Sequence, residues 1–323
     1  MPLVSIVVPN YNYARYLTER MDSIFSQTFE DYEVIILDDC STDNSREIIE
    51  QYRNHPKVKL IEYNEHNSGS PFKQWQKGVA LASGKYVWIA ETDDSAKPEF
   101  LSSAVELLEK NTDAVLAFTG ADVVDSQGRI TGTDFDRWEK RHISNKDGYR
   151  VLDGDSYIVH NMYWHTYVYN ASGTVFRRDA VEEGMFERCG KMKNAGDWLF
   201  WTMLIGGRKN IEIYKKLNIY RLHDSNTTVR GIQSGNIKFE DIKVMKYIED
   251  NYPVGWYRKA MRHGLFVKQI KREKRYSQQT KDEIIATMKR DLGASDWDYR
   301  LQRANKVLWH LCPLLLTDKN DRL

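Results

Sequence analysis

The sequence is poor in cysteine, lacks a long hydrophobic run and carries almost no net charge. Its three cysteines, at positions 40, 189 and 312, form no C-x-x-C pair, so neither a disulfide framework nor a zinc site is indicated. The longest apolar run, VLWHLCPLLL at 307–316, is far shorter than the ~20 residues that a membrane-spanning helix needs. A net charge of +1 over 323 residues gives no general attraction to nucleic acid, and no basic segment precedes the first apolar run as in a signal peptide. We therefore expect a cytoplasmic globular protein that binds no nucleic acid.

The first third of the chain alternates between strand-like and helix-like patterns. Three of its four β-rich runs are nearly continuous apolar stretches, as in parallel strands that are covered on both faces. Between the runs, apolar residues recur at helical spacing, for example Leu17, Met21 and Ile24. This alternation predicts βαβ units and an α/β fold with a mostly parallel, Rossmann-like sheet flanked by helices. The predicted strands are 4–8, 33–37, 58–63 and 86–90.

Polar clusters follow three of these strands. They are PNYN at 9–12, DDCSTD at 38–43 and ETDD at 91–94. Because ligands bind beyond the carboxyl ends of the strands in such sheets, we expect the three clusters to face one shared crevice. Local alternatives stay open, since Asp43 could cap a helix with Ser41 and Thr42, and the acids at 91–94 could form a solvated turn.

The remainder of the chain predicts a further strand at 115–118, a hairpin over 211–223 and charged helices from about residue 237. Residues 257–275 contain eight Lys or Arg and only one acid, with Leu265, Phe266 and Ile270 as an apolar side. Such a helix can lie on an anionic membrane surface, or it can pack on the rest of the protein with its charges in water. No G-x-G-x-x-G follows any strand, which argues against a nicotinamide dehydrogenase.

Together these motifs resemble glycosyltransferase family 2, the inverting nucleotide-sugar transferases with the GT-A fold. The resemblance covers about residues 3–228 and rests on VSIVVPNYN, EVIILDDCSTDNS, the segment from Trp75 to Asp94, SGTVFRR, GDW and YRLHDSNTT, in that order. It implies a nucleotide-sugar-binding half over 1–112, an acceptor-binding and catalytic half over 113–232, and a helical extension over 233–323. It also implies transfer of a sugar from a UDP-type donor to a glycan or lipid-linked hydroxyl, as in bacterial enzymes that build cell-surface polysaccharides. Such an enzyme would work in the cytoplasm or at the inner face of the membrane.

The resemblance assigns roles to residues in these motifs. A divalent cation, Mn²⁺ or Mg²⁺, would stabilise the charge of the departing diphosphate, and hard cations prefer carboxylate oxygens. The expected metal ligands are Glu91, Asp94 and His223. Asp39 is expected to bind the uracil ring, and Pro9 and Tyr11 to form the wall on which the base rests. The remaining expected donor-binding residues are Lys73, Asp93 and Arg221.

Inverting transfer also needs a general base for the acceptor hydroxyl. The resemblance places this base at Asp197, immediately before the helix that starts with WLFW, although an aspartate there can also be a helix cap. His223 could make a purely structural hydrogen bond, and Lys73 could be a solvated helix lysine. The chain departs from the family where Glu91 replaces the usual Asp and Gly196 replaces a frequent Glu. These departures leave a second hypothesis, a protein that keeps the fold and binds a nucleotide-sugar but has lost catalysis.

Overall fold

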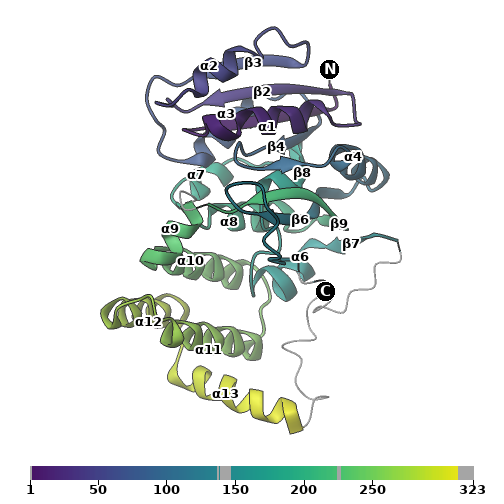
Figure 1. The fold of residues 1–323 in the computed structure, drawn as a ribbon. Coiled ribbons are helices and arrows are strands. Elements are labelled where there is room, and N and C mark those ends of the chain that lie inside the picture. Colours follow the sequence, from purple (N-terminus) through teal and green to yellow (C-terminus); the bar gives the residue numbers. More distant parts are fainter. Residues whose placement is uncertain (1, 137, 139–146, 224–226, 312–323) are drawn as a thin grey trace. The chain divides into compact units, whose positions relative to one another are not determined.

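The computed structural model describes residues 2–311 apart from 137, 139–146 and 224–226 (Figure 1). The described chain divides into two compact units, of which the first contains the sheet and the second is helical. Unit 1 comprises Met1–Gly154, Tyr167–Lys191 and Met203–His223. Unit 2 comprises Asp155–Thr166, Met192–Thr202 and Asp224–Leu323.

The amino-terminal part of unit 1 is a parallel sheet with the strand order β3-β2-β1-β4. Every residue of β1 and β2 is buried, which explains why these strands read as apolar runs in the sequence. All four predicted strands are confirmed. They are β1 (Val4–Asn10), β2 (Tyr32–Asp38), β3 (Val58–Tyr63) and β4 (Tyr86–Ile89). The helices that follow them are α1 (Ala14–Phe25), α2 (Ser45–Glu50), α3 (Pro71–Leu81) and α4 (Phe100–Lys110).

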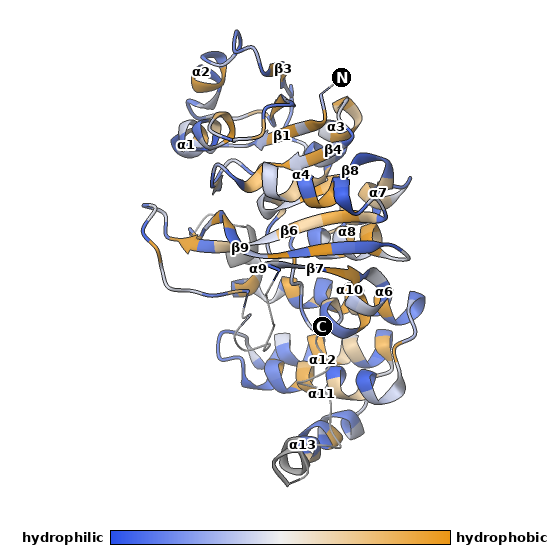
Figure 2. Cartoon of the chain, turned by 90° about the vertical axis from the view of Figure 1, so that its right-hand side faces the viewer, coloured by the Kyte–Doolittle hydropathy of each residue, from blue (hydrophilic) through white to orange (hydrophobic). Residues whose placement is uncertain are grey.

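The helices pack on this sheet through the apolar stripes that the sequence predicts. Leu17, Met21 and Ile24 of α1 are fully buried in the main core, whose strands carry the orange stretches in Figure 2. Helix α3 lies so close to β1 that a Cβ atom at Gly78 would come within 2.2 Å of Val7 Cγ1. Only glycine permits this approach of helix to strand.

The second half of the sheet is mixed. Strand β8 (Thr174–Arg177) is antiparallel to both β4 and β6 (Ala114–Val124). Strand β6 pairs in parallel with β9 (Lys209–Arg221). On its other side β9 pairs with two short antiparallel strands, β5 (Ser95–Ala96) and β7 (Tyr149–Asp153). Because β5 directly follows the ETDD cluster, its pairing with β9 brings that cluster to the carboxyl end of β9.

The hairpin predicted over 211–223 is wrong, because these residues belong to the single 13-residue strand β9. The pairing with β6 steps from Ile213 opposite Thr119 to Lys216 opposite Gly120, so two residues of β9 bulge out of register. A bulge increases the local twist without reversing the chain. The two consecutive lysines at 215 and 216 therefore belong to an irregular strand.

Unit 2 contains the helices predicted after about residue 237. Phe266 and Ile270 of α11 are buried and Leu265 is partly buried, so the apolar side of this helix is covered. No helix in the described part of the chain is both long enough and apolar enough to cross a bilayer. The longer helices are α8 (Gly196–Ile205, which continues into unit 1), α10 (Asn236–Asn251), α11 (Trp256–Arg272), α12 (Gln278–Leu292) and α13 (Asp296–Leu311). The shorter ones are α6 (Gly154–Tyr157), the π-helix η1 (Ile158–Met162) and α9 (Thr227–Ser234).

Candidate active site

The three polar clusters meet at one edge of the sheet in unit 1. Asn10, at the end of β1, donates to Asp38 Oδ1 at the end of β2 over 2.8 Å. Ser41 Oγ donates to the same oxygen at 2.6 Å. Thr92 Oγ1 of the ETDD cluster donates to the carbonyl of Pro9 at 2.8 Å. These hydrogen bonds fix the loops after β1, β2 and β4 to one another, as the strand-end argument predicts.

Asp39 is buried among hydrogen-bond donors. Its Oδ1 accepts from Asn64 Nδ2 at 2.6 Å, from the Ser68 amide at 2.9 Å and from Gln74 Nε2 at 2.8 Å. Its Oδ2 accepts from Ser68 Oγ at 2.7 Å, which leaves that oxygen room for one more donor. Lys73 Nζ donates to the Ser68 carbonyl at 2.9 Å, so this lysine holds the same loop.

The residues expected to form the wall for the base lie at the end of β1 and just beyond it. Pro9 is a buried residue of β1, whereas the Tyr11 side chain is 46% exposed on the following loop. Tyr11 is one of the few large aromatic side chains of the described chain that lie so open. An exposed aromatic ring beside a strand-end cluster is available for stacking on a flat ligand.

The carboxylates of Glu91 and Asp94 are both held by donors from other elements. The Trp75 indole N–H donates to Glu91 Oε1 at 2.7 Å. Asp94 Oδ1 accepts from the Arg221 amide at 2.9 Å, and Asp94 Oδ2 accepts from Asn170 Nδ2 at 2.6 Å. Asp94 is buried, and its two oxygens already serve as acceptors that fix the loop to β9 and to the segment before β8.

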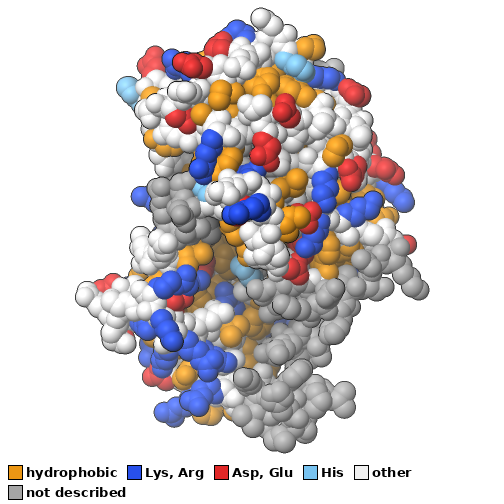
Figure 3. Space-filling model, viewed as in Figure 1, with side chains coloured by type: hydrophobic (Ala, Val, Ile, Leu, Met, Phe, Trp, Pro, Cys, Tyr) orange, Lys and Arg blue, Asp and Glu red, His pale blue; other side chains and the backbone are white. Residues whose placement is uncertain are grey.

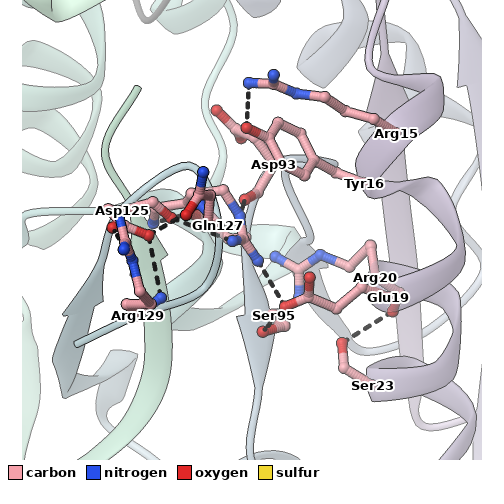
Figure 4. A network of polar contacts seen from close by, with 12 residues as sticks. Arg15, Tyr16, Glu19, Arg20, Ser23, Asp93, Ser95, Asp125, Gln127 and Arg129 are labelled. Carbon is pink, nitrogen blue, oxygen red and sulfur yellow. Dashed lines mark hydrogen bonds and ion pairs between the residues drawn. The ribbon is translucent and has the colours of Figure 1, made fainter. Parts of the chain in front are cut away.

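Asp93 points instead toward His223. Asp93 Oδ2 lies 3.0 Å from His223 Nε2, and the imidazole is buried between two tyrosine rings. The ring centroids of Tyr13 and Tyr16 lie 5.4 and 5.5 Å from that of His223. Figure 4 shows Tyr16 reaching from α1 to the side of Asp93, with Arg15 bonded to the Tyr16 hydroxyl. The aromatic rings hold the imidazole in one orientation against the carboxylate.

Arg221 binds protein groups in this structure. Its Nε donates to the Asp93 carbonyl at 2.9 Å, and its Nη1 donates to the Asp125 carbonyl at 3.2 Å. Its Nη2 pairs with Glu19 Oε1 at 2.5 Å, and its guanidinium lies over the Tyr16 ring. Arg221 therefore fixes the ETDD loop between α1 and the loop that contains Asp125.

Arg20 is a site residue that the sequence reading missed. Its side chain is fully buried behind the ETDD loop, where Nε donates to the Glu91 carbonyl at 2.8 Å and Nη2 to Ser172 Oγ at 2.7 Å. Its guanidinium lies 5.4 Å from the Trp88 ring centroid. Burial lowers the pKa of Arg20 to about 10, and the charges of Asp94, Asp93 and Glu91 oppose that shift. Arg20 thus supplies positive charge beneath three carboxylates.

Burial and mutual repulsion disfavour the ionised forms of the carboxylates in this cluster. Burial, followed by the charge of Asp93, raises the pKa of Glu91 to about 8. Burial and the charge of Asp93 also raise the pKa of Asp94. The pKa of the Tyr13 hydroxyl is raised, first by burial and then by Asp93, Glu91 and Asp94. A cation bound at this position would lower the electrostatic cost of keeping these groups ionised.

The described residues contain no group of three or more Asp, Glu, His or Cys side chains arranged around a common metal position. They do contain the Asp93–His223 pair, in which a carboxylate oxygen lies 3.0 Å from an imidazole nitrogen. Mn²⁺ accepts this combination of oxygen and nitrogen donors. The pair thus presents two donor types that a divalent ion accepts.

Asp197 lies in unit 2, apart in sequence and in compact unit from the other candidates. It is the second residue of α8, and its Oδ1 accepts from the Trp198 amide at 2.8 Å. The Trp198 indole N–H donates to the Met162 carbonyl at 3.0 Å, which anchors the start of the helix. Burial, with smaller contributions from the charges of Glu240 and Asp241, raises the pKa of Asp197 from 3.8 to about 6. A carboxylate with that pKa can accept a proton near neutral pH.

Asp43 acts locally. Its Oδ2 accepts from the Ala14 amide at the start of α1 at 2.9 Å, and its Oδ1 accepts from the Ser45 amide at the start of α2 at 3.0 Å. The helix-cap alternative for this residue thus matches its contacts, and Asp43 ties two helix starts to the loop after β2.

Cys40, next to Asp39, has a left-handed backbone with φ of 64°. This conformation costs about 1–2 kcal/mol for a residue with a Cβ atom, and glycine avoids that cost but loses more entropy on folding. We predict that Cys40→Gly raises the free energy of unfolding by about 0.5–1 kcal/mol, measured by urea denaturation. Cys40→Ser keeps the Cβ atom and is the control, for which no gain is expected. A Gly variant no more stable than the Ser variant would contradict the assignment of strain.

Comparison with known proteins gives a consistent result. The family described as glycosyl transferase family 2 matches residues 5–185. Similar curated proteins include the poly(ribitol-phosphate) beta-N-acetylglucosaminyltransferase TarS of Staphylococcus aureus, 36% identical over 114 residues, which are 35% of this chain and 20% of TarS. An uncharacterized glycosyltransferase of Haemophilus influenzae is 27% identical over 263 residues, 76% of this chain and 79% of the relative. The chain spans half or less of the length of the first curated relatives that it matches.

Solved structures share the fold at low sequence identity. The crystal structure of S. aureus TarS 1-349 in complex with UDP-GlcNAc matches with a TM-score of 0.68 at 19% identity, covering 99% of this chain and 89% of that one. The mannosyltransferase PcManGT from Pyrobaculum calidifontis in complex with GDP-Man and Mn²⁺ matches with a TM-score of 0.52 at 15% identity, covering 99% and 85%. With the matched family, these likenesses confirm the predicted GT-A fold with a helical carboxyl-terminal region.

Proposed function

This chain belongs to glycosyltransferase family 2, and from that membership we propose that it is a metal-dependent, inverting transferase with a UDP-type sugar donor. The proposed acceptor is a hydroxyl of a glycan or lipid-linked sugar in cell-surface polysaccharide synthesis. The observation that carries the proposal is the Asp93–His223 pair, which lies on the same sheet edge as the Asp39 loop. The UDP-GlcNAc complex of TarS supports a uridine donor, and relatives named for poly(ribitol-phosphate) and chondroitin support a polymeric acceptor.

Donor binding is assigned to the loops of unit 1. The free acceptor capacity of Asp39 Oδ2 would take the N–H of the uracil ring, and Tyr11 would stack on the base. Asp93 and His223 would hold a divalent cation, which supplies positive charge to the leaving diphosphate when bound. Glu91 and Asp94, the other proposed metal ligands, also tie this loop to other elements through Glu91 Oε1 and both Asp94 oxygens. We assign donor binding to residues 1–112, the acceptor side to 113–232 and a supporting role to the extension 233–323.

Asp197 is the proposed general base. Its carboxylate would take the proton of the acceptor hydroxyl as that oxygen attacks the anomeric carbon from the face opposite the nucleotide, which inverts the configuration. Because the pKa of Asp197 is about 6, the residue is ionised at neutral pH and is still basic enough to accept the proton.

The proposal is tested first by ligand binding. Thermal unfolding is followed with UDP, GDP and a panel of UDP-sugars, each with and without Mn²⁺. A ligand at about 100 times its dissociation constant stabilises the folded state by about 2.7 kcal/mol, which gives a shift of several degrees. We expect the largest shift with a UDP-sugar and Mn²⁺ together. No shift with any uridine nucleotide would contradict the donor assignment.

Slow donor hydrolysis separates the enzyme from a catalytically inactive binding protein. An enzyme releases UDP from its UDP-sugar at a measurable rate that depends on Mn²⁺, because water can replace the acceptor. A scaffold protein binds the same donor and produces a thermal shift without releasing UDP.

We further propose that unit 2 touches the inner face of an anionic membrane, where lipid-linked acceptors reside. The apolar side of α11 is buried, so the contact would rest on exposed charge, including Lys271, Arg272 and Lys274, and on the 74%-exposed ring of Trp256. Figure 3 shows Lys and Arg side chains gathered over α11 and α12. We expect the protein to sediment with phosphatidylglycerol vesicles at low salt, but not with neutral vesicles or at high salt. If the protein does not bind the anionic vesicles, the proposed membrane contact is contradicted.

A further inference from the structure

The loop that leads into α8 is held by a single carboxylate from another helix. Glu240 of α10 accepts three consecutive backbone N–H groups: Oε1 from Lys193 at 2.8 Å, and Oε2 from Asn194 at 2.7 Å and from Ala195 at 2.8 Å. Hydrogen bonds from neutral amides to an ionised acceptor are stronger than those between neutral groups. The charge of Glu240 thus fixes residues 193–195, and Asp197 follows two positions later.

A second contact holds the same loop from α9. A Cβ atom at Gly231 would lie 2.0 Å from Asn194 Oδ1, so the backbone of α9 and the side chain of Asn194 are in close contact. The loop is therefore enclosed by α9 and α10, whereas the Trp198 indole fixes the first turn of α8 to Met162. These contacts all lie within unit 2.

We infer that Glu240 is a positioning residue for Asp197. Glu240 holds the three residues that lead into α8, and the position of these residues sets the direction of the Asp197 side chain. The inference rests on the proposed role of Asp197 as the base. It also gives the carboxyl-terminal extension a function, since the residue that places the base belongs to α10 and not to the sheet. A displacement of about 1 Å at a reacting group can cost about 100-fold in rate, so this hold matters for catalysis.

The charged groups around Asp197 allow a second, electrostatic readout. Glu240 and Asp241 both disfavour the ionised form of Asp197, and Asp241 is in turn paired with Lys238 at 2.7 Å. Lys193 lies on the held loop itself, and its side chain is exposed. Removing the charge of Glu240 takes away one negative neighbour while Asp241, Lys238 and Lys193 remain, so proton uptake by Asp197 shifts to lower pH.

The test is Glu240→Gln, with Asp250→Asn as the matched control. Glutamine keeps the length of the side chain but offers one acceptor oxygen instead of two, and its NH₂ group faces backbone donors. We expect kcat to fall between about 10- and 100-fold with the donor KM unchanged, and the acidic limb of the pH–rate profile to move to lower pH. Asp250 lies on the same helix in an exposed pair with Lys246, and its variant should match the wild type in kcat and profile.

The pKa of Asp197, followed by ¹³C NMR of its carboxyl group in the wild type and in Glu240→Gln, gives a readout that needs no activity. A lower pKa in the variant supports the contact. Wild-type kcat and pH profile in Glu240→Gln, or a loss confined to thermal stability with an unchanged profile, would overturn the inference. A further outcome is that the wild type transfers no sugar although the pKa of Asp197 differs between the wild type and Glu240→Gln. In that case the proposed role of Asp197 as the base fails, whereas the placement of Asp197 by Glu240 stands.

Discussion

Replacing Asp197 with asparagine is expected to lower kcat by about 10²–10⁴-fold, the usual contribution of a positioned general base. Asparagine has the same shape, and its Oδ1 can still accept the Trp198 amide, so the start of α8 is preserved. A helix cap survives this substitution, whereas a base does not, because an amide cannot take the proton of the acceptor hydroxyl. The variant therefore distinguishes the catalytic role from the structural one.

The measurement is a single-turnover sugar transfer rate, with the circular dichroism spectrum and donor binding as controls. The variant should bind the donor with wild-type affinity, since the assigned donor residues all lie in unit 1. A folded Asp197→Asn protein that transfers sugar within about threefold of the wild-type rate would exclude Asp197 as the base.

The pH dependence follows from the raised pKa of Asp197. Its pKa is 3.8 in the unfolded chain and about 6 in the folded protein, so the folded protein holds this proton in the range between the two values. As the pH rises from 3.8 to about 6, Asp197 ionises in the unfolded chain before it ionises in the folded protein, so the free energy of unfolding falls. Activity rises as the pH passes about 6, because Asp197 of the folded protein then changes to its base form. We expect kcat/KM to increase through about pH 6. At pH 8 the Asp197→Asn variant should be at least as stable as the wild type.

Replacing Arg20 with methionine is expected to lower the free energy of unfolding by about 3–5 kcal/mol at pH 8, as when one partner of a buried charge network is removed. The substitution removes one of the two hydrogen bonds that the Glu91 carbonyl accepts and one of the two that Ser172 Oγ accepts. It also removes the positive charge beneath Glu91, Asp93 and Asp94. Methionine fills much of the space, so the loss reports mainly on charge and hydrogen bonds.

Urea denaturation measures this change, and its pH dependence identifies the cause. The deficit should shrink at pH 5, because Glu91 and Asp94, whose pKa values are already raised, are then protonated and need no compensating charge. Arg53→Met, at an exposed pair with Glu50, is the control and should change stability by less than about 1 kcal/mol. An Arg20→Met protein within 1 kcal/mol of the wild type at pH 8 would refute the role assigned to this arginine.

Local pattern was enough to predict the parallel half of the sheet. The strands β1, β2 and β4 are buried on both faces, and burial on both faces leaves a continuous apolar run that a sequence displays directly. The same reasoning failed for β9, because its bulge at Tyr214 and Lys215 interrupts the apolar pattern in a similar way to a hairpin turn.

Partners that are distant in the chain could not be read from pattern alone. Asp93 and His223 are separated by 130 positions, and the pairing of β5 with β9 brings them together. Arg20, in contrast, left a readable signal, since it lies on the buried face of α1 that the apolar stripe defines. A charged residue within an apolar helical stripe indicates a buried ionic network, and the carboxylates of ETDD were its available partners.

The proposed donor site requires Asp93 and His223 to hold a cation together with the diphosphate. Electron paramagnetic resonance of Mn²⁺ with UDP present measures this directly in the wild type, in Asp93→Asn and in the control Asp122→Asn, whose carboxylate pairs with Lys97. We predict UDP-dependent Mn²⁺ binding in the wild type and in the control, and affinity at least ~10-fold weaker in Asp93→Asn. Equal Mn²⁺ binding in all three proteins, or none in the wild type, would contradict the site.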